Sequence, residues 1–346
     1  MRKILSVLPS ALLMASLAAC PLQAQQATTP RTPGEILQAA PANDWVRIAP
    51  GDLMVMDLAP DATGKPRRVV IQFVPRPFSQ GWIANIRRLA AAHWYDGTAV
   101  VRVQDNYVAQ WGDPDAETPG KARPLPNGLI AVRESAYTFE RTPENEAAWR
   151  ETLEAVPPAP RKEALPADIR STRTDSASEG WHVRDSYAPW VEFHRGWPVG
   201  ADGEGPDARF WPIHCYGSVG VGRNLSPDTG SGAELYAVIG HAPRQLDRNI
   251  AVIGRVIEGI EHLSSLPRGT GDIGFYKTAA ERTAIASVRM GTEVPDLPAY
   301  EYLSTASASF AAYADKRANR QDDFYIRPAG GVDACNVQVP VRAVKP

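Results

Sequence analysis

The sequence predicts a mainly β fold in which a helix packs on a sheet. Three short runs, residues 45–48, 53–57 and 67–73, alternate apolar and polar side chains in the way a half-buried sheet does. A stretch with helical spacing follows at residues 82–94. Asp96-Gly97 then supplies a tight turn, and a run rich in β-branched residues comes after it. Strand, helix, turn and strand therefore follow one another in the first third of the chain.

The predicted helix is amphipathic. Ser79 can serve as its N-cap, because a serine hydroxyl at that position accepts a hydrogen bond from the backbone of the first turn. Arg87 and Arg88 lie outside the apolar stripe, so one face is expected to pack on the sheet. The stripe consists of Trp82, Ile83, Ile86, Leu89, Ala90 and Trp94.

The strand after Gly97 carries one cationic residue, Arg102. Because side chains alternate along a strand, we expect Arg102 to share a face with Val100 and to oppose Val101 and Val103. The ordinary interpretation of a strand arginine is a solvated surface charge, since arginine is rarely buried. The residues that follow favour a functional interpretation instead.

Tyr107, Val108 and Gln110 follow Arg102 within a few residues. With the helix and turn before it, this segment, residues 82–114, resembles the signature of the cyclophilins, which are proline cis/trans isomerases. In that family an arginine, an aromatic, an aliphatic residue and a glutamine at this spacing line the proline groove. The resemblance implies a cyclophilin-like closed eight-stranded antiparallel β-barrel with capping helices, which has no free sheet edge.

A second block, residues 217–259, resembles the same family. Glu234-Leu235-Tyr236 stands where members carry a glutamine followed by two phenylalanines. Leu246-Asp247 and the later Ile253-Gly254-Arg255-Val256 match the Leu-Asp and Phe-Gly-x-Val elements of the family. By this resemblance Tyr236 and Leu246 complete the pocket that Tyr107 and Val108 begin, and Gln110 orients the substrate backbone.

The chain also departs from the family pattern. Gln245 stands where many members have tryptophan, Ile250 stands where they have histidine, and Trp111 replaces a glycine. These changes concern substrate preference and turnover more than fold.

The glycines at Gly220 and Gly222 permit close approach of another backbone. We therefore expect backbone groups near Gly222 and Arg223 to pair with an extended substrate. A dinucleotide-binding loop is the alternative for this segment. It is disfavoured because Leu225 occupies the place of the third glycine and no acidic residue follows at the expected distance.

The resemblance implies a non-covalent isomerase that acts on proline-containing polypeptides and uses no cofactor. Twisting the X-Pro amide frees the proline nitrogen lone pair, which Arg102 is the candidate to hydrogen-bond. No G-x-S-x-G or H-E-x-x-H motif is present. The sequence therefore does not favour acyl transfer, metal-dependent hydrolysis or a metal site. The alternative function is a non-catalytic cyclophilin-like periplasmic chaperone or assembly module.

The N-terminus predicts an export signal at residues 1–24. Arg2 and Lys3 precede an apolar segment, residues 4–19, and small residues follow. Two kinds of processing fit, namely cleavage after Ala24 and lipid modification of Cys20, because residues 17–20 resemble a bacterial lipobox. We expect an exported protein of the bacterial periplasm. No later segment is apolar enough to span a bilayer.

The charge balance gives no reason to expect nucleic acid as a partner. Loss of residues 1–24, which hold two bases and no acid, would change the formal charge from −2 to −4. A weakly acidic chain of this kind does not favour an anionic membrane surface either.

Two cysteines, Cys215 and Cys335, are left after an exported chain loses or lipidates Cys20. An even pair in an oxidising compartment favours a disulfide, and two buried free thiols are the alternative. The neighbouring His214 is interpreted as a strand histidine.

The chain divides into a linker at residues 25–43, a barrel at 44–291 with an insertion at about 115–212, and a C-terminal extension at 292–346. The insertion has a predicted helix at 142–153 and a tryptophan-rich segment at 181–211, for which structural packing is favoured over a partner surface. A short helix at 259–266 and a closing strand at 283–290 end the barrel. The extension carries a predicted helix near 300–318, with Tyr302, Leu303, Ala306, Phe310 and Tyr313 on its packed face.

Overall fold

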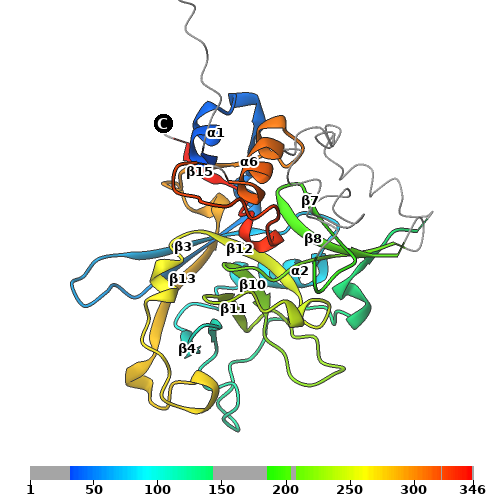
Figure 1. The fold of residues 1–346 in the computed structure, drawn as a ribbon. Helices are drawn as coiled ribbons and strands as arrows, with labels where there is room; N and C mark the ends of the chain where they lie inside the picture. The colour runs from blue at the N-terminus through cyan, green and yellow to red at the C-terminus, as the bar shows by residue number, and fades with distance from the viewer. Residues whose placement is uncertain (1–31, 143–184, 204–207, 321, 345–346) are drawn as a thin grey trace, which may run out of the picture.

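The computed structural model describes residues 32–142, 185–203, 208–320 and 322–344. Its centre is a closed eight-stranded antiparallel barrel with the strand order β10-β11-β5-β4-β13-β2-β3-β12, in which β12 pairs with β10 (Figure 1). The predicted barrel is confirmed. Its strands are β2 (Leu53–Leu58), β3 (Arg67–Phe73), β4 (Ala99–Val103), β5 (Val108–Gly112), β10 (Ser218–Val221), β11 (Leu235–Val238), β12 (Val252–Glu258) and β13 (Thr283–Met290).

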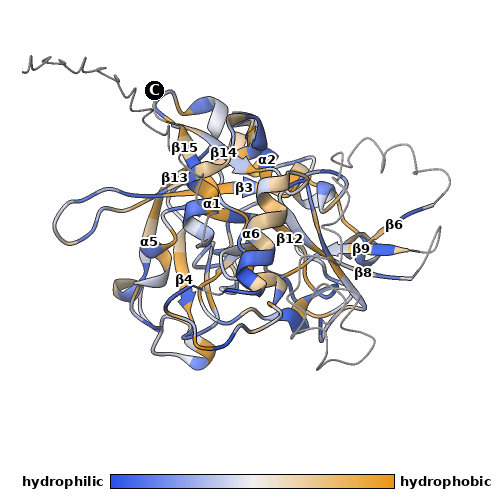
Figure 2. Cartoon of the chain, turned by 45° about the horizontal axis from the view of Figure 1, so that its top comes forward, coloured by the Kyte–Doolittle hydropathy of each residue, from blue (hydrophilic) through white to orange (hydrophobic). Residues whose placement is uncertain are grey.

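The strands β2 and β3 are buried on both faces. Met54 and Ile71 point into the main hydrophobic core of the barrel, whereas Leu53 and Val70 belong to a second core that the C-terminal segment covers. This is why most residues of β2 are buried instead of every second one. Figure 2 shows the apolar residues gathered on the strands.

The helix α2 (Gln80–Ala91) closes one end of the barrel with the predicted apolar face, which the main core includes. Ser79 occupies the N-cap position, but its side chain makes no capping bond. Its backbone is left-handed, with φ 55°, and its hydroxyl donates to the carbonyl of Val252 at 2.7 Å. The capping prediction is therefore wrong, since the hydroxyl ties the helix to β12. Trp94 lies beyond the helix end and is nevertheless buried.

The first and last segments that the structure describes form a second layer against β2 and β3. Its sheet consists of β1 (Trp45–Arg47), β14 (Ala299–Leu303) and β15 (Val341–Val344), with α1 (Pro33–Ala39) packed on α6 (Ala308–Ala318). Figure 1 shows α1, α6 and β15 together at one end of the molecule.

Three sequence predictions for this layer are corrected. Part of the expected linker is the helix α1, which a capping box of Thr32 and Glu35 begins. The strand β1 pairs with β14, so the barrel itself starts at β2 and not at residue 44. The predicted helix at 300–318 begins only at Ala308, because Ser307 caps it and Tyr302 lies in β14. The same large apolar residues fit a strand and a helix face, and only pairing with β1 decided between them.

The insertion adds a small antiparallel sheet. Its strand order is β6 (Phe139–Glu140), β9 (Arg209–Pro212), β8 (Trp197–Asp202) and β7 (Trp190–His194). Within the tryptophan-rich segment Trp197 and Trp211 are buried, and Trp197 joins the main core, while Trp190 is exposed. The predicted helix at 142–153 lies, apart from its first residue, outside the described residues.

A disulfide joins Cys215 to Cys335, with 5.1 Å between their Cα atoms and a sequence separation of 120. It connects the segment before β10 to the C-terminal segment, inside a small apolar cluster that includes Val191, Trp211 and Ala334. The predicted short helix at 259–266 is α5 (Glu261–Ser264), and the predicted closing strand at 283–290 is β13. Among the residues described, no helix is long and apolar enough to cross a membrane.

Candidate active site

A bulge in β4 decides which way Arg102 points. Val100 pairs with Trp111 and Arg102 pairs with Gln110, so Val101 is an extra residue opposite two consecutive residues of β5. Paired residues share a face, and Val100 and Trp111 are fully buried in the barrel. Arg102 and Gln110 therefore lie on the outer face. The prediction that Arg102 shares a face with Val100 is wrong, because alternation does not continue through a bulge.

Three uncharged oxygens hold the Arg102 guanidinium. Its Nε donates to the carbonyl of Ile273 at 2.8 Å, Nη1 donates to Oε1 of Gln110 at 3.0 Å, and Nη2 donates to Oε1 of Gln104. An arginine has five N–H groups. One N–H on each of Nη1 and Nη2 is thus not engaged by any residue that the structure describes, and these two could donate to a bound substrate.

Two aromatic rings flank the same guanidinium. Its Cζ lies 5.6 Å from the ring centre of Tyr107 and 5.4 Å from that of Phe275. Burial lowers the pKa of Arg102, while Tyr107 and Glu234 act to raise it. Arginine starts from so high a pKa that it remains charged at neutral pH. The site therefore presents a half-buried cation that hydrogen bonds hold in place.

A small apolar cluster lies beside Arg102 on the outer face of the barrel. The register places Tyr236 opposite Gln110 and Val238 opposite Val108. Val108, Tyr236 and Val238 are buried together, separately from the barrel core, with Tyr107 and Ile250 packed against them. We call these five residues the outer-face cluster. Of the residues predicted from the sequence, the structure thus brings Tyr107, Val108, Gln110 and Tyr236 together around Arg102.

The other predicted binding residues are placed less directly. The N–H of Gly222 donates to the carbonyl of Glu234 at 2.8 Å within the barrel, so this group is not available to pair with a substrate. Arg223 donates to the carbonyl of Asn249 at 3.0 Å, which links the glycine-rich segment to the one after β11. Leu246 is half-buried at the end of a 3-10 turn, Arg244–Leu246, and Ile250 of the outer-face cluster donates to its carbonyl at 3.1 Å.

A buried polar network under Tyr236 was missed by sequence reasoning. The Tyr236 hydroxyl lies 2.9 Å from Nε2 of His214, and Nδ1 of His214 lies 2.9 Å from Asp247. Asp247 in turn pairs with Arg244 at 2.6 Å, and Arg244 pairs with Asp185 at 2.7 Å. His214 is completely buried, lies between β9 and β10 and contacts the tyrosine hydroxyl, so its interpretation as a strand histidine is wrong. The tyrosine in place of a phenylalanine was the one sequence signal for such a partner.

Two further side chains of the site were also missed. Glu234 accepts a hydrogen bond from Nε2 of Gln110. Phe275 contacts Arg102 from the loop after α5. A hydrogen bond from the Tyr276 N–H to the carbonyl of Val101, 2.9 Å long, holds this loop beside β4. Glu234 was visible as a departure from the family glutamine, whereas no sequence signal pointed to Phe275.

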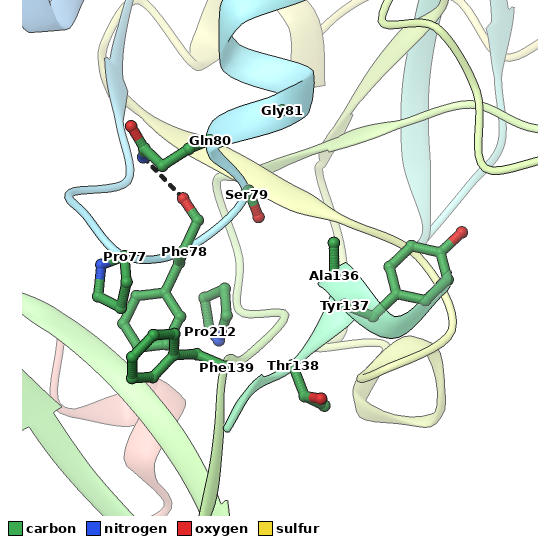
Figure 3. A pocket seen from close by; sticks show the side chains of 10 residues that line it. All are labelled: Pro77, Phe78, Ser79, Gln80, Gly81, Ala136, Tyr137, Thr138, Phe139 and Pro212. Carbon is green, nitrogen blue, oxygen red and sulfur yellow. Dashed lines mark hydrogen bonds between the residues drawn. The ribbon is translucent and has the colours of Figure 1, made fainter. Parts of the chain in front are cut away.

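A concavity lies at the start of α2, and Arg102 is not among the residues that line it (Figure 3). No charged side chain lines it, and it contains none of the predicted site residues. Its lining residues are Pro77, Phe78, Ser79, Gln80, Gly81, Ala136, Tyr137, Thr138, Phe139 and Pro212. The described residues also contain no group of three or more His, Cys, Asp and Glu side chains placed to hold a metal ion.

Comparison with solved structures defines the class of fold. A cyclophilin from Hirschia baltica, AquaCyp293, aligns with a TM-score of 0.58 over 91% of this chain and 98% of its own, at 18% sequence identity. A cyclophilin-type peptidyl-prolyl cis-trans isomerase from Cryptosporidium parvum aligns with a TM-score of 0.35 at 11% identity, over 69% of this chain and 97% of its own. The first of these likenesses shows that the fold is that of the cyclophilins.

The family follows from the sequence match. Residues 81–289 match the family described as cyclophilin type peptidyl-prolyl cis-trans isomerase/CLD. No curated protein matches the chain. The chain belongs to the cyclophilin-type peptidyl-prolyl cis-trans isomerase family, and it is an isomerase of the peptide bond before proline.

Proposed function

We propose that this isomerase acts on X-Pro bonds of exported proteins and that Arg102 assists the rotation without any covalent step. The observation that carries the proposal is the guanidinium of Arg102, held by three neutral acceptors at the edge of the outer-face cluster. A proline ring needs an apolar surface, and the rotating amide needs a fixed donor nearby. The outer face of β4, β5 and β11 offers both within one small area.

The chemistry asked of the site is modest. An X-Pro bond crosses a barrier of about 20 kcal/mol, and no bond has to be broken. A catalyst need only bind the twisted amide better than either planar isomer. Twisting ends the resonance, so the proline nitrogen becomes an acceptor. In our proposal one of the two unengaged N–H groups of Arg102 donates to that nitrogen or holds the neighbouring carbonyl.

The substrate pocket of the proposal is the outer-face cluster. Tyr107 and Val108 would contact the proline ring, with Tyr236 beneath them and Leu246 at the rim, while Gln110 would orient the substrate backbone. Backbone groups next to Arg223 remain our candidates for pairing with an extended polypeptide. A pocket that holds the ring while the rest of the chain turns lowers the barrier through position alone.

Export is proposed from the predicted signal at residues 1–24, which lie outside the described residues. The disulfide supports it, because disulfides persist in oxidising compartments such as the bacterial periplasm. Cell fractionation and the mass of the mature N-terminus would test the location. A mass with acyl chains on Cys20 would indicate a lipid anchor, and a start after Ala24 would indicate simple cleavage.

The activity test compares purified wild type with Arg102→Ala in cis-to-trans conversion of a proline test peptide. Loss of a donor directed at a transition state costs roughly 100-fold in rate, so we expect a fall of that order. Arg47→Ala is the matched control, since Arg47 is an exposed arginine of β1, remote from the barrel strands that carry the site. Full activity of a folded Arg102→Ala variant would contradict the proposed role, and an inactive wild type would favour a binding module.

A further inference from the structure

Glu234 lies at the far end of a hydrogen-bonded chain that leads to Arg102. Its Oε1 accepts from Nε2 of Gln110, and Oε1 of Gln110 accepts from Nη1 of Arg102 at 3.0 Å. Carboxylate, neutral amide and guanidinium thus follow one another from the residue before β11 to β5 and β4. Glu234 and Gln110 are 124 residues apart in sequence, so only the barrel brings them together.

The carboxylate of Glu234 and the guanidinium of Arg102 select the same orientation of the Gln110 amide. A glutamine amide has a donor end and an acceptor end, and only its acceptor end can serve Arg102, which has no acceptor of its own. An ionised carboxylate accepts and never donates, so it selects the NH₂ end of the amide. The oxygen end is then directed at Arg102. A protonated carboxyl can also donate and no longer imposes this orientation.

The fold leaves room for this side chain. A Cβ atom at Gly222 would lie 2.9 Å from Cγ of Glu234, and one at Gly112 would lie 3.4 Å from the same atom. Glycine at Gly222 is therefore needed beside the glutamate stem, at the end of β10. This gives Gly222 a function different from the substrate pairing expected from the sequence.

The surroundings of Glu234 favour its protonated form more than water does. Burial raises the pKa of Glu234 above its usual value, and the negative charge of Glu117 raises it further. The bond from Gln110 and the charge of Arg102 act in the opposite direction without reversing the shift. These groups come from β5, the segment after β5, and β4, and Gly222, directly after β10, lies against the Glu234 stem. The carboxylate form is present above the raised pKa and is lost as the pH falls through it.

We propose that Glu234 is a positioning residue of the isomerase: as a carboxylate it fixes the Gln110 amide so that the amide oxygen holds Arg102, and protonation releases that hold. The inference rests on the proposed function of Arg102. Activity should then fall on acidification, through a group that never touches the substrate. The glutamine that family members carry at this position cannot titrate, so the pH dependence is a property of this chain.

The test measures kcat and KM by NMR exchange between pH 4 and 8, with an acetylated and amidated X-Pro peptide that has no titrating group. Wild type should lose activity on the acid side. Glu234→Gln keeps an acceptor for Gln110, so its kcat should stay within about threefold of wild type at pH 8. It should lose the fall of activity at low pH, which we call the acid limb. Glu234→Leu removes the acceptor and should lower kcat roughly tenfold at every pH with little change in KM.

Glu117→Gln is the matched control, because it removes a nearby charge without touching the hydrogen-bonded chain. It should keep the acid limb and move it to lower pH. The side-chain amide resonance of Gln110, assigned from its absence in Gln110→Leu, gives a readout independent of activity. It should titrate in wild type and stay constant in Glu234→Gln.

The outcomes separate the two proposals. The positioning role of Glu234 would be overturned by an unchanged kcat in Glu234→Leu, or by a fall of activity at low pH that persists in Glu234→Gln. In either case, loss of activity in Arg102→Ala would leave the proposed function standing. If Arg102→Ala kept full activity, the proposed function would fail, and a constant Gln110 resonance would then overturn the Glu234 inference as well. If Glu234→Leu did not fold, the Glu234→Gln profile would decide.

Discussion

At the scale of single residues, buried polar side chains under the site hold other side chains in place. The Tyr236 hydroxyl is fixed by His214, whose other nitrogen faces Asp247. Burial raises the pKa of Tyr236 far above its usual value, so the hydroxyl keeps its proton and can donate. The carboxylate of Asp247 accepts a hydrogen bond from Nδ1–H of His214, which leaves Nε2 to accept a hydrogen bond from the tyrosine hydroxyl.

This arrangement predicts how much the Tyr236 hydroxyl contributes to the free energy of unfolding. Tyr236→Phe restores the residue that the family carries but leaves Nε2 of His214 buried without a partner. We expect the free energy of unfolding to fall by about 1 to 3 kcal/mol, with isomerase activity close to wild type. Urea denaturation of both proteins measures the first value. Unchanged stability would mean that the tyrosine hydroxyl contributes nothing to the fold.

At the scale of elements, the turn after α2 is tied to the last strand of the barrel. Both oxygens of Asp96 bind Arg289 of β13 at 2.8 Å, and the N–H of Val288 donates to the same carboxylate at 3.1 Å. Burial acts to raise the pKa of Asp96, but the bonds from Arg289 and Val288 outweigh it, so the pKa is lowered. The carboxylate therefore stabilises the fold above the unfolded-state pKa, and this stabilisation is lost as the pH falls through the folded-state pKa.

Asp96→Asn should lower the free energy of unfolding by about 1 to 2 kcal/mol at pH 7. The difference from wild type should shrink as the solution is acidified, because the wild-type carboxylate is then protonated too. Asp296→Asn is the control, since Asp296 is exposed and its pair with Arg68 should contribute little. A difference that stays constant down to pH 2 would argue against a charge effect.

At the scale of the whole molecule, one disulfide lies at the junction of three parts of the fold. The Cys215–Cys335 disulfide lies where the insertion sheet, the segment leading into β10 and the C-terminal layer meet. It closes a loop of 120 residues, and long loops lose the most unfolded-state entropy when they are cross-linked.

The double variant Cys215→Ser/Cys335→Ser should be less stable than wild type by about 4 to 5 kcal/mol in the chain-entropy model. Urea unfolding with and without a reductant measures this, and reduced wild type should resemble the variant. Equal midpoints for oxidised and reduced wild type would contradict the prediction. The barrel core does not include either cysteine, so we expect the folded variant to keep its isomerase activity.

The sequence by itself determined the helix α2 through its local periodicity, and the group of Arg102, Tyr107, Val108 and Gln110 through a motif contained in one hairpin. The barrel followed from the resemblance of that motif and of a second block to the cyclophilins. Tertiary structure decided the rest. The outward direction of Arg102 comes from a bulge, and the placement of Tyr302 in a strand comes from pairing with β1. The contacts of Glu234 and His214 join residues far apart in the chain. Such contacts depend on which strands become neighbours, and no pattern within a single segment records that.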